Sequence, residues 1–341
     1  MIKYLGSKRR LVPVLAELLQ RSGARTALDL FTGTTRVAQA FKQCGATVTA
    51  VDTARYSEVF ARTWIETDAS SLTPSDRAEL ADEIARLDAL PGEAGYVTET
   101  FCRSARFFQP HNGERIDAIR QAIADDHAGT WREPILLTSL LLAADRVDST
   151  VGIQMAFVKQ WSPRSYKTMR LEVPELLPGT GQAVRGDAVE LAAGLGEFDL
   201  AYLDPPYNQH RYFTNYHVWE TLVAWDHPEH YGVACKRVDA RDESTKSVFN
   251  RKRDMPDALR STIASVRANT VVVSYNDESW VTLEELCDMC AVHGPVEVLS
   301  FESRRYVGAQ IGIHDPTGRK VGKVGRTTNL EYIIVARTLG V

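Results

Sequence analysis

The sequence predicts an α/β fold with a doubly wound, mostly parallel sheet, and three observations lead to this prediction. Two short apolar runs near the N-terminus, 27–31 and 47–51, flank a segment with helical periodicity. Further apolar, β-branched runs occur at 198–203 and 270–275. Strands that alternate with helical segments are typical of parallel sheets covered by helices.

The first 65 residues follow this alternation element by element. Apolar residues at helical spacing predict a helix over 11–19. A turn at 32–35 follows the first strand, and a second helical pattern runs through Phe41. The β-branched run 47–51 predicts a strand that ends at Asp52. This β-turn-α-β unit is the usual start of a parallel sheet.

The pattern becomes helical between residues 66 and 180. Helical periodicity covers three stretches, 76–90, 113–125 and 131–147. Prolines and glycines then interrupt the chain before residue 181. We therefore predict a helical subdomain at 66–180, inserted into a domain formed by 1–65 and 181–341.

Two further strands are expected near the C-terminus. The runs 295–301 and 331–337 have strand character, and a basic, glycine-containing segment joins them. We expect them to form an antiparallel pair at one edge of the sheet.

Composition narrows the function classes. The chain has 341 residues, of which 44% are hydrophobic and 25% charged, and its net charge of −4 excludes a globally basic nucleic-acid binder. Locally basic stretches remain, for example 159–170. Five scattered cysteines do not form a disulfide framework, and no run of about 18 apolar residues predicts a membrane span. A cytoplasmic protein without membrane contact is expected.

A first group of candidate site residues surrounds the turn after the first strand. Ligands bind at the carboxyl ends of strands in open α/β sheets. Gly33 allows a ligand to approach the backbone, Asp29 and Phe31 flank the same edge, and Asp52 can accept hydrogen bonds from ribose hydroxyls. The turn lacks the G-x-G-x-x-G pattern, which disfavours a nicotinamide cofactor and favours a nucleoside ligand without pyrophosphate. The alternative is a tight turn followed by an ordinary acid at a strand end.

A second group is the run Asp204-Pro205-Pro206-Tyr207, which follows the strand at 198–203. The two prolines must end the strand and stiffen the loop. The Asp204 carboxylate and the neighbouring Pro205 carbonyl can together hold a planar aryl amine by its two hydrogens. Tyr207 can stack on the same ring. This combination suits methylation of an exocyclic base amine.

These motifs resemble the DNA adenine methylase family, which uses S-adenosylmethionine to methylate the 6-amino group of adenine. The resemblance implies a Rossmann-like methyltransferase sheet, with Asp204, Pro205, Pro206 and Tyr207 as the catalytic motif. It also implies a set of cofactor-binding residues, namely Tyr4, Lys8, Asp29, Phe31, Gly33, Asp52 and Asp187. Double-stranded DNA is the implied partner, and no metal is expected.

Thr35 departs from the family pattern. The cofactor loop of the family reads Phe-x-Gly-x-Gly, and Thr35 stands at the second glycine. Because β-branched residues disfavour positive φ, we expect this turn to adopt another conformation at that position.

The resemblance gives the helical insertion a role in target recognition. Basic and aromatic residues at 159–167 can track phosphate and stack on a flipped base, with Lys159, Trp161, Arg164 and Tyr166 as candidates. After the catalytic motif, His210, Arg211 and Tyr212 are expected to shape the base pocket. Packing is the alternative for these side chains.

The predicted activity is therefore methyl transfer to adenine at a specific DNA sequence, with the base flipped out of the duplex. Two alternatives stay open, a DNA-binding regulator without catalytic activity and the same chemistry on RNA or on the cytosine amine. Cys287, Cys290 and His293 have a metal-like spacing but lie on a helical pattern without a second ligand pair. The recognition sequence, the oligomeric state and a cognate restriction enzyme are not readable from the sequence.

Overall fold

The computed structural model describes residues 2–6, 8–158, 160–207, 209, 211–304 and 328–338. The chain divides into two compact units. Unit 1 consists of Met1–Asp187 and Arg211–Ser247, and unit 2 consists of Ala188–His210 and Val248–Val341. The helical segment 66–180 thus belongs to the same unit as the first strands.

Unit 1 is built on three parallel strands, β1 (Thr26–Asp29), β2 (Thr47–Asp52) and β3 (Gly181–Arg185). They lie in the order β3-β2-β1. Asp29 pairs with Ala50, and Asp52 pairs with Arg185, so the carboxyl ends of the strands lie at one edge. A two-stranded antiparallel ribbon, β5 (His230–Tyr231) and β6 (Lys236–Arg237), belongs to the same unit.

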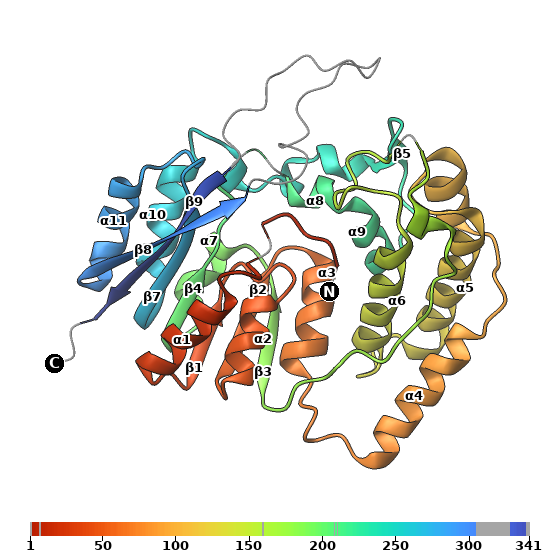
Figure 1. Ribbon diagram of the computed structural model, residues 1–341, viewed down its shortest axis with the longest axis horizontal. Helices are drawn as coiled ribbons and strands as arrows, with labels where there is room; N and C mark the ends of the chain where they lie inside the picture. The colour runs from red at the N-terminus through yellow and green to blue at the C-terminus, as the bar shows by residue number, and fades with distance from the viewer. Residues whose placement is uncertain are drawn as a thin grey trace. The chain divides into compact units, whose positions relative to one another are not determined.

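The helices of unit 1 come from its N-terminal part, the 66–180 segment and 211–224 (Figure 1). They are α1 (Val12–Ser22), α2 (Arg36–Gln43), α3 (Arg55–Ala61), α4 (Pro74–Asp88), α5 (Pro110–His127), α6 (Glu133–Val147), α8 (Tyr212–Asn215) and α9 (His217–Ala224). Two π-helical segments, η1 (Arg62–Glu66) and η2 (Thr98–Ser104), extend α3 and precede α5. Local signals explain several ends: Gly23 closes α1 at φ 68°, and Thr73 forms a capping box with Asp76 at the start of α4.

Helix α6 is part of the core of unit 1. Its side chains Leu136, Leu140, Leu141 and Ala144 are all buried, and the helix packs against α3 and α5. The 66–180 segment therefore contributes residues to the core of unit 1.

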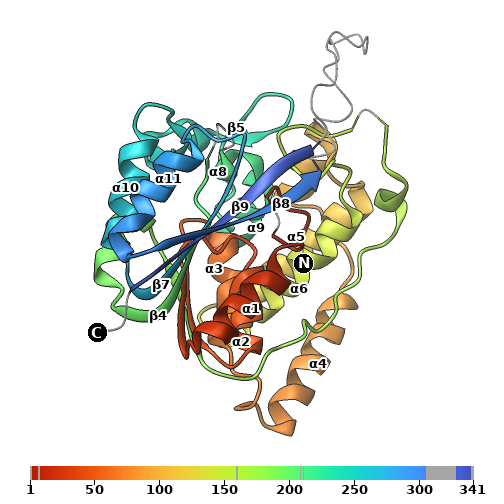
Figure 2. The same cartoon turned by 60° about the vertical axis from the view of Figure 1, so that its left-hand side comes forward.

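The described residues of unit 2 form four strands, β4 (Glu197–Leu203), β7 (Arg267–Asn276), β8 (Val296–Arg304) and β9 (Thr328–Arg337). Strands β4 and β7 are parallel, whereas β9 is antiparallel to both β7 and β8. The predicted antiparallel pair is thus confirmed. Its helices are α7 (Ala188–Leu191), α10 (Met255–Ser265) and α11 (Leu283–Cys290), and α10 and α11 lie side by side (Figure 2).

The predicted α/β class with mostly parallel strands is confirmed, because β1, β2 and β3 in unit 1 and β4 and β7 in unit 2 are parallel neighbours. The predicted helices of the 66–180 segment are also present as α4, α5 and α6. None of the helices that the structure describes combines the length and the apolar character needed to cross a bilayer.

A buried lysine links α2 to η1. The Lys42 side chain is 2% exposed, and its Nζ donates hydrogen bonds to the carbonyls of Trp64 (3.1 Å), Ile65 (2.8 Å) and Thr67 (2.8 Å). The ammonium thus satisfies the last carbonyls of a helix end, which would otherwise be unpaired. Burial lowers the pKa of Lys42 to about 8.

We predict that Lys42→Met lowers the free energy of unfolding by about 2–3 kcal/mol, because it leaves three carbonyls without their donor. The loss should grow as the pH rises above about 8. Above that pH the unfolded wild-type chain binds a proton that the native state has released, which favours the native state. Urea unfolding at pH 7 and pH 9.5 measures both effects. The exposed Lys252→Met is the control and should change stability by less than about 0.5 kcal/mol; a similar loss in both variants would contradict the account.

Candidate functional site

The turn after β1 is held in place by a buried carboxylate. Asp29 Oδ2 accepts hydrogen bonds from Thr32 Oγ1 (2.9 Å) and from the Ala38 N–H (3.1 Å). Gly33 within the turn has φ 52°, and a Cβ there would lie 3.1 Å from the Tyr4 ring. Glycine is therefore required for both conformation and space.

Asp52 connects this turn to the end of β2. One carboxylate oxygen accepts from the Gly33 N–H (2.8 Å) and the other from the Ala54 N–H (3.0 Å). Burial raises the pKa of Asp52, and the backbone N–H groups oppose this shift. The Asp52 carbonyl accepts from the Gly186 N–H at 3.0 Å, which places Asp187 beside the same strand end. The predicted cofactor residues Gly33, Asp52 and Asp187 thus gather at the carboxyl edge of unit 1.

A cluster of four tyrosines packs against this edge. The Tyr4 ring stacks on Tyr216, with ring centroids 4.7 Å apart, and on Tyr212 at 5.3 Å. The hydroxyls of Tyr4 and Tyr56 are 3.3 Å apart, and the Tyr216 hydroxyl accepts from the Leu5 N–H at 2.6 Å. The cluster explains why Tyr4 is held beside Gly33.

Lys8 and Phe31 are two more of the predicted cofactor residues. The carbonyl of Lys8 accepts from the N–H groups of Leu11 and Val12 and so begins α1, while its side chain is buried. Phe31 is half-buried in the turn. Their roles in cofactor binding stay predictions.

The expectation for Thr35 is wrong. This residue has φ 62° and ψ 14°, which is the left-handed conformation that glycine adopts most readily. The side chain is fully buried, its Oγ1 accepts from Gln39 Nε2 (2.8 Å), and its N–H donates to the Thr32 carbonyl (2.7 Å). These bonds hold the turn in a conformation that costs an L-residue about 1–2 kcal/mol.

The run Asp204–Tyr207 lies at the end of β4 in unit 2. The Ser274 hydroxyl, on the neighbouring strand β7, is 3.5 Å from Asp204 Oδ1. The Tyr207 ring packs edge-on against Tyr275, with centroids 5.4 Å apart, and it is half-buried. Pro205 is buried and Asp204 is half-buried, so the corner combines a fixed backbone with an accessible carboxylate.

The predicted DNA-contacting residues of the 66–180 segment differ in their surroundings. Arg164 binds a nearby part of its own segment. Its Nε donates to the Asp148 carbonyl (2.7 Å), and its Nη2 donates to the Asp148 carboxylate (2.6 Å) and to the Thr150 carbonyl (2.7 Å). Trp161 lies under the Arg106 guanidinium at 4.7 Å, and Tyr166 is 64% exposed. Their contacts with DNA stay predictions.

The remaining candidates follow the catalytic motif. Arg211 Nη2 donates to the Ala240 carbonyl at 2.5 Å, and Tyr212 belongs to the tyrosine cluster, with its hydroxyl 3.4 Å from the Leu5 carbonyl. Lys159 and His210 lie outside the described residues.

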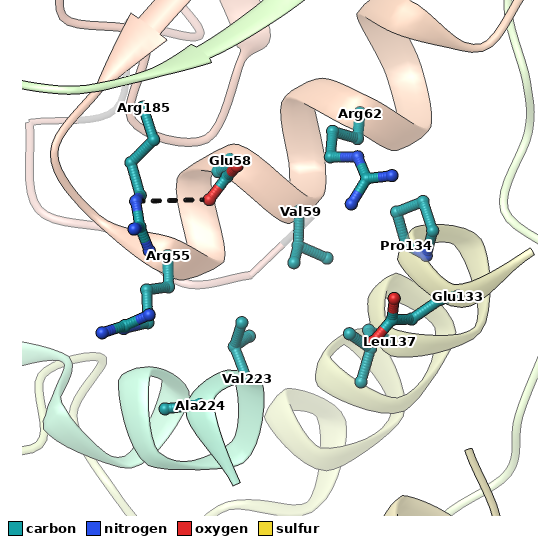
Figure 3. A pocket seen from close by; sticks show the side chains of 10 residues that line it. All are labelled: Arg55, Glu58, Val59, Arg62, Glu133, Pro134, Leu137, Arg185, Val223 and Ala224. Carbon is teal, nitrogen blue, oxygen red and sulfur yellow. Dashed lines mark ion pairs between the residues drawn. The ribbon is translucent and has the colours of Figure 1, made fainter. Parts of the chain in front are cut away.

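A pocket of about 190 Å³ lies in unit 1 between α3, α6 and α9 (Figure 3). Three arginines line it, Arg55, Arg62 and Arg185, together with apolar side chains of α6 and α9. Arg185 Nε is 3.5 Å from Glu58 Oε2. Among the described residues, none of those predicted for cofactor, catalysis or DNA lines this pocket.

Comparison with known proteins identifies the family. The sequence profile of the D12 class N6 adenine-specific DNA methyltransferases matches residues 4–289. The chain belongs to this family. The resemblance to the DNA adenine methylase family that the motifs predicted is thereby confirmed.

Individual relatives are modification enzymes. The chain is 28% identical to the modification methylase StsI of Streptococcus sanguinis over 89% of this chain and 49% of the relative. It is 27% identical to the type II methyltransferase M.NlaIII of Neisseria lactamica, over 89% of this chain and 92% of the relative. It is 30% identical to the type II methyltransferase M.CviAII of Paramecium bursaria Chlorella virus 1, over 62% and 64%. The chain thus spans about half the length of the StsI methylase and most of M.NlaIII.

Sequence reasoning missed three residues beside the cofactor edge, Tyr56, Tyr216 and Glu220. All three are buried in unit 1. Tyr56 and Tyr216 complete the tyrosine cluster, and Glu220 accepts from the Arg55 N–H at 2.8 Å. Glu220 could have been noticed in the sequence only as an acid at a buried position of an amphipathic helix. Acids are rarely buried without a partner, so such a position indicates a specific contact.

We predict that Thr35→Asn raises the free energy of unfolding by about 0.5–1 kcal/mol, because asparagine tolerates the left-handed region and is a favourable N-cap. Thr35→Val keeps the branched Cβ and loses the hydroxyl that Gln39 contacts. We expect it to lower stability by about 1 kcal/mol. Urea unfolding of the three proteins measures this order, and equal stability of the asparagine and valine variants would contradict the left-handed assignment.

Proposed function

We propose that the chain methylates the 6-amino group of adenine within a specific double-stranded DNA sequence. The observation that carries the proposal is the gathering of Gly33, Asp52 and Asp187 at one strand edge, together with the Asp204–Tyr207 corner at the end of another strand. Family membership supports the class of reaction. The positions of these side chains support the assignment of individual roles.

The carboxyl edge of unit 1 fits the nucleoside part of S-adenosylmethionine. Asp52 uses one lone pair of each oxygen on a backbone N–H, and a carboxylate oxygen can accept a second hydrogen bond. We assign Asp52 to the ribose hydroxyls and Gly33 to the close backbone approach, with Asp187 beside them. Tyr4, Lys8, Asp29 and Phe31 complete the assigned cofactor set. When bound, the cofactor supplies a methyl group already activated by the sulfonium charge.

The Asp204 carboxylate and the Pro205 carbonyl would each accept one hydrogen of the adenine amine. These two bonds draw the nitrogen lone pair out of the ring and stabilise the positive charge that develops on nitrogen during transfer. The amine nitrogen would take the methyl group from the sulfonium, which would leave as a neutral thioether, and the methylated nitrogen would release one proton to solvent. Ser274, which contacts Asp204, would hold the carboxylate in this orientation. Pro206 stiffens the corner, and Tyr207 would stack on the base.

Because the amine cannot be reached inside the stacked duplex, we propose that the target base is flipped out. The 66–180 segment would recognise the target, with Lys159, Trp161, Arg164 and Tyr166 near the DNA and His210, Arg211 and Tyr212 around the base. The internal bonds of Arg164 support a loop-positioning role more than a phosphate contact.

We further propose a cognate restriction enzyme as partner and the cytoplasm as location. The relatives, which include a modification methylase and a type II methyltransferase, support a role in protecting DNA from such a nuclease. A silent DNA-binding regulator is less well supported, because Thr35, which departs from the family pattern, still adopts the left-handed conformation that glycine favours.

We predict that Asp204→Ala lowers kcat for methyl transfer at least 100-fold, because one of the two groups that orient the amine is lost. Cofactor affinity should stay within about twofold of wild type. Transfer of labelled methyl groups to adenine-containing duplex DNA, followed by mass spectrometry of the nucleosides, measures activity, and calorimetry with S-adenosylmethionine measures binding.

The matched control is Asp199→Ala, which removes an aspartate from the same strand, where Asp199 contacts Asn269. Its turnover should equal that of wild type. Retained turnover of Asp204→Ala would refute the catalytic assignment, and labelled cytosine or RNA in place of adenine in DNA would refute the proposed substrate.

A further inference from the structure

A buried acid outside the predicted site holds the chain segment that carries Asp52. The Glu220 side chain on α9 is 2% exposed, and its Oε1 accepts from the Arg55 N–H at 2.8 Å. Its carboxylate also accepts from the Tyr56 N–H. These two N–H groups belong to the first turn of α3, where they have no partner within the helix.

The start of α3 lacks a side-chain cap of its own. The N-cap residue is Ala54, whose side chain cannot accept a hydrogen bond. Glu220 supplies the acceptor instead, and it does so from a residue 165 positions away in the sequence. A carboxylate at this end of a helix is also favoured by the helix dipole.

The segment 52–56 is therefore fixed by two carboxylates. Asp52 accepts from the Ala54 N–H at one end, and Glu220 accepts from the next two N–H groups at the other. The hydroxyl of Tyr56, the last residue of this segment, contacts the hydroxyl of Tyr4 beside Gly33. A shift of α3 would move both Asp52 and the tyrosine cluster.

We propose that Glu220 is a positioning residue for the cofactor site, which it serves by fixing the turn that carries Asp52. This inference rests on the proposed cofactor role of Asp52. Glu220 contacts backbone N–H groups of α3 and acts on the cofactor through them.

The surroundings of Glu220 make this function sensitive to pH near neutrality. Burial raises the pKa of Glu220 to about 7, and hydrogen bonds from α3 and the charges of Arg55 and Arg237 oppose the shift. Arg55 and Tyr56 on α3 and Arg237 on β6 are the charged and titratable groups that face it. Below about pH 7 the carboxyl gains a proton, loses its charge and accepts more weakly from the two N–H groups.

Steady-state kinetics of the whole chain test the proposal, with KM for S-adenosylmethionine, KM for DNA and kcat measured from pH 6 to pH 8.5. In Glu220→Gln the amide oxygen can still accept from one N–H of α3. The NH₂ group cannot accept from the other N–H, which therefore loses its partner. We expect a 3- to 10-fold higher KM for the cofactor with KM for DNA and kcat within twofold. The wild-type KM for the cofactor should rise below about pH 7, and the glutamine variant should lack this dependence.

Thr221→Val is the matched control. Thr221 is the next residue of α9 and is fully buried, and its hydroxyl donates to the His217 carbonyl at 2.8 Å. The hydroxyl also accepts from Arg237 Nη1 at 3.4 Å, but Asp226 and Asp239 hold Arg237 in place without this bond. It should leave the KM for the cofactor and its pH dependence unchanged. The same rise in both variants would mean that α9 acts only through stability and would overturn the proposal.

An active Glu220→Gln enzyme with the wild-type cofactor KM and pH profile would also overturn it, while the proposed function would stand. A wild-type chain that binds S-adenosylmethionine and transfers no methyl group would refute the proposed function instead. Calorimetry of cofactor binding then still decides the role of Glu220, because it needs no turnover.

Discussion

The Asp52 carboxylate is the interaction on which the rest of the cofactor edge depends. It accepts from the Gly33 N–H of the first turn and from the Ala54 N–H that precedes α3. Two loops that follow adjacent parallel strands are thereby joined by one side chain. The Gly186 N–H binds the Asp52 carbonyl, so a third loop is aligned with the other two. A half-buried carboxylate in such a position is fixed by backbone donors and keeps acceptor capacity for a ligand.

Hydrogen bonds, stacked rings and charged side chains together hold the segments around Asp52. Asp29 and Thr35 set the first turn through buried hydrogen bonds, and stacked tyrosine rings cover its glycine. Glu220 and Lys42 satisfy opposite ends of the helix that α3 and η1 form together, since one accepts from its first N–H groups and the other donates to its last carbonyls. Each helix end thus has a charged partner of the sign that its dipole favours. The segment that follows β2 is consequently rigid at both ends.

Local sequence signals predicted the strands and helices that carry strong periodicity. The β-branched run of β2, the buried run of β7 and the antiparallel pair β8 and β9 were all predictable, because period-two and apolar patterns dominate there. Strand β3 was missed, since it is a short, partly polar strand with one strand neighbour within unit 1. The carboxyl-edge position of Gly33, Asp52 and Asp187 could be predicted because strand ends converge in any parallel sheet.

Other features of the site depend on contacts that no local pattern reveals. Glu220 and the N–H of Arg55 are distant in sequence, and the buried tyrosines pair across equally distant segments. Thr35 shows the limit of propensity arguments, because local hydrogen bonds of its side chain and its N–H hold a β-branched residue at φ 62°. Arg164 looked like a phosphate ligand by charge alone, yet its guanidinium binds its own loop.

The most direct measurement for the central claim is the affinity of Asp52→Asn for S-adenosylmethionine by calorimetry, alongside its affinity for duplex DNA. Asparagine keeps the size of the side chain. Its NH₂ group cannot accept a hydrogen bond, however, so one of the two backbone N–H groups that Asp52 binds would lose its acceptor. We expect cofactor affinity to fall roughly 10- to 100-fold, which corresponds to about 1.4–2.7 kcal/mol, with DNA affinity unchanged. Cofactor binding as tight as that of the wild type would contradict the account.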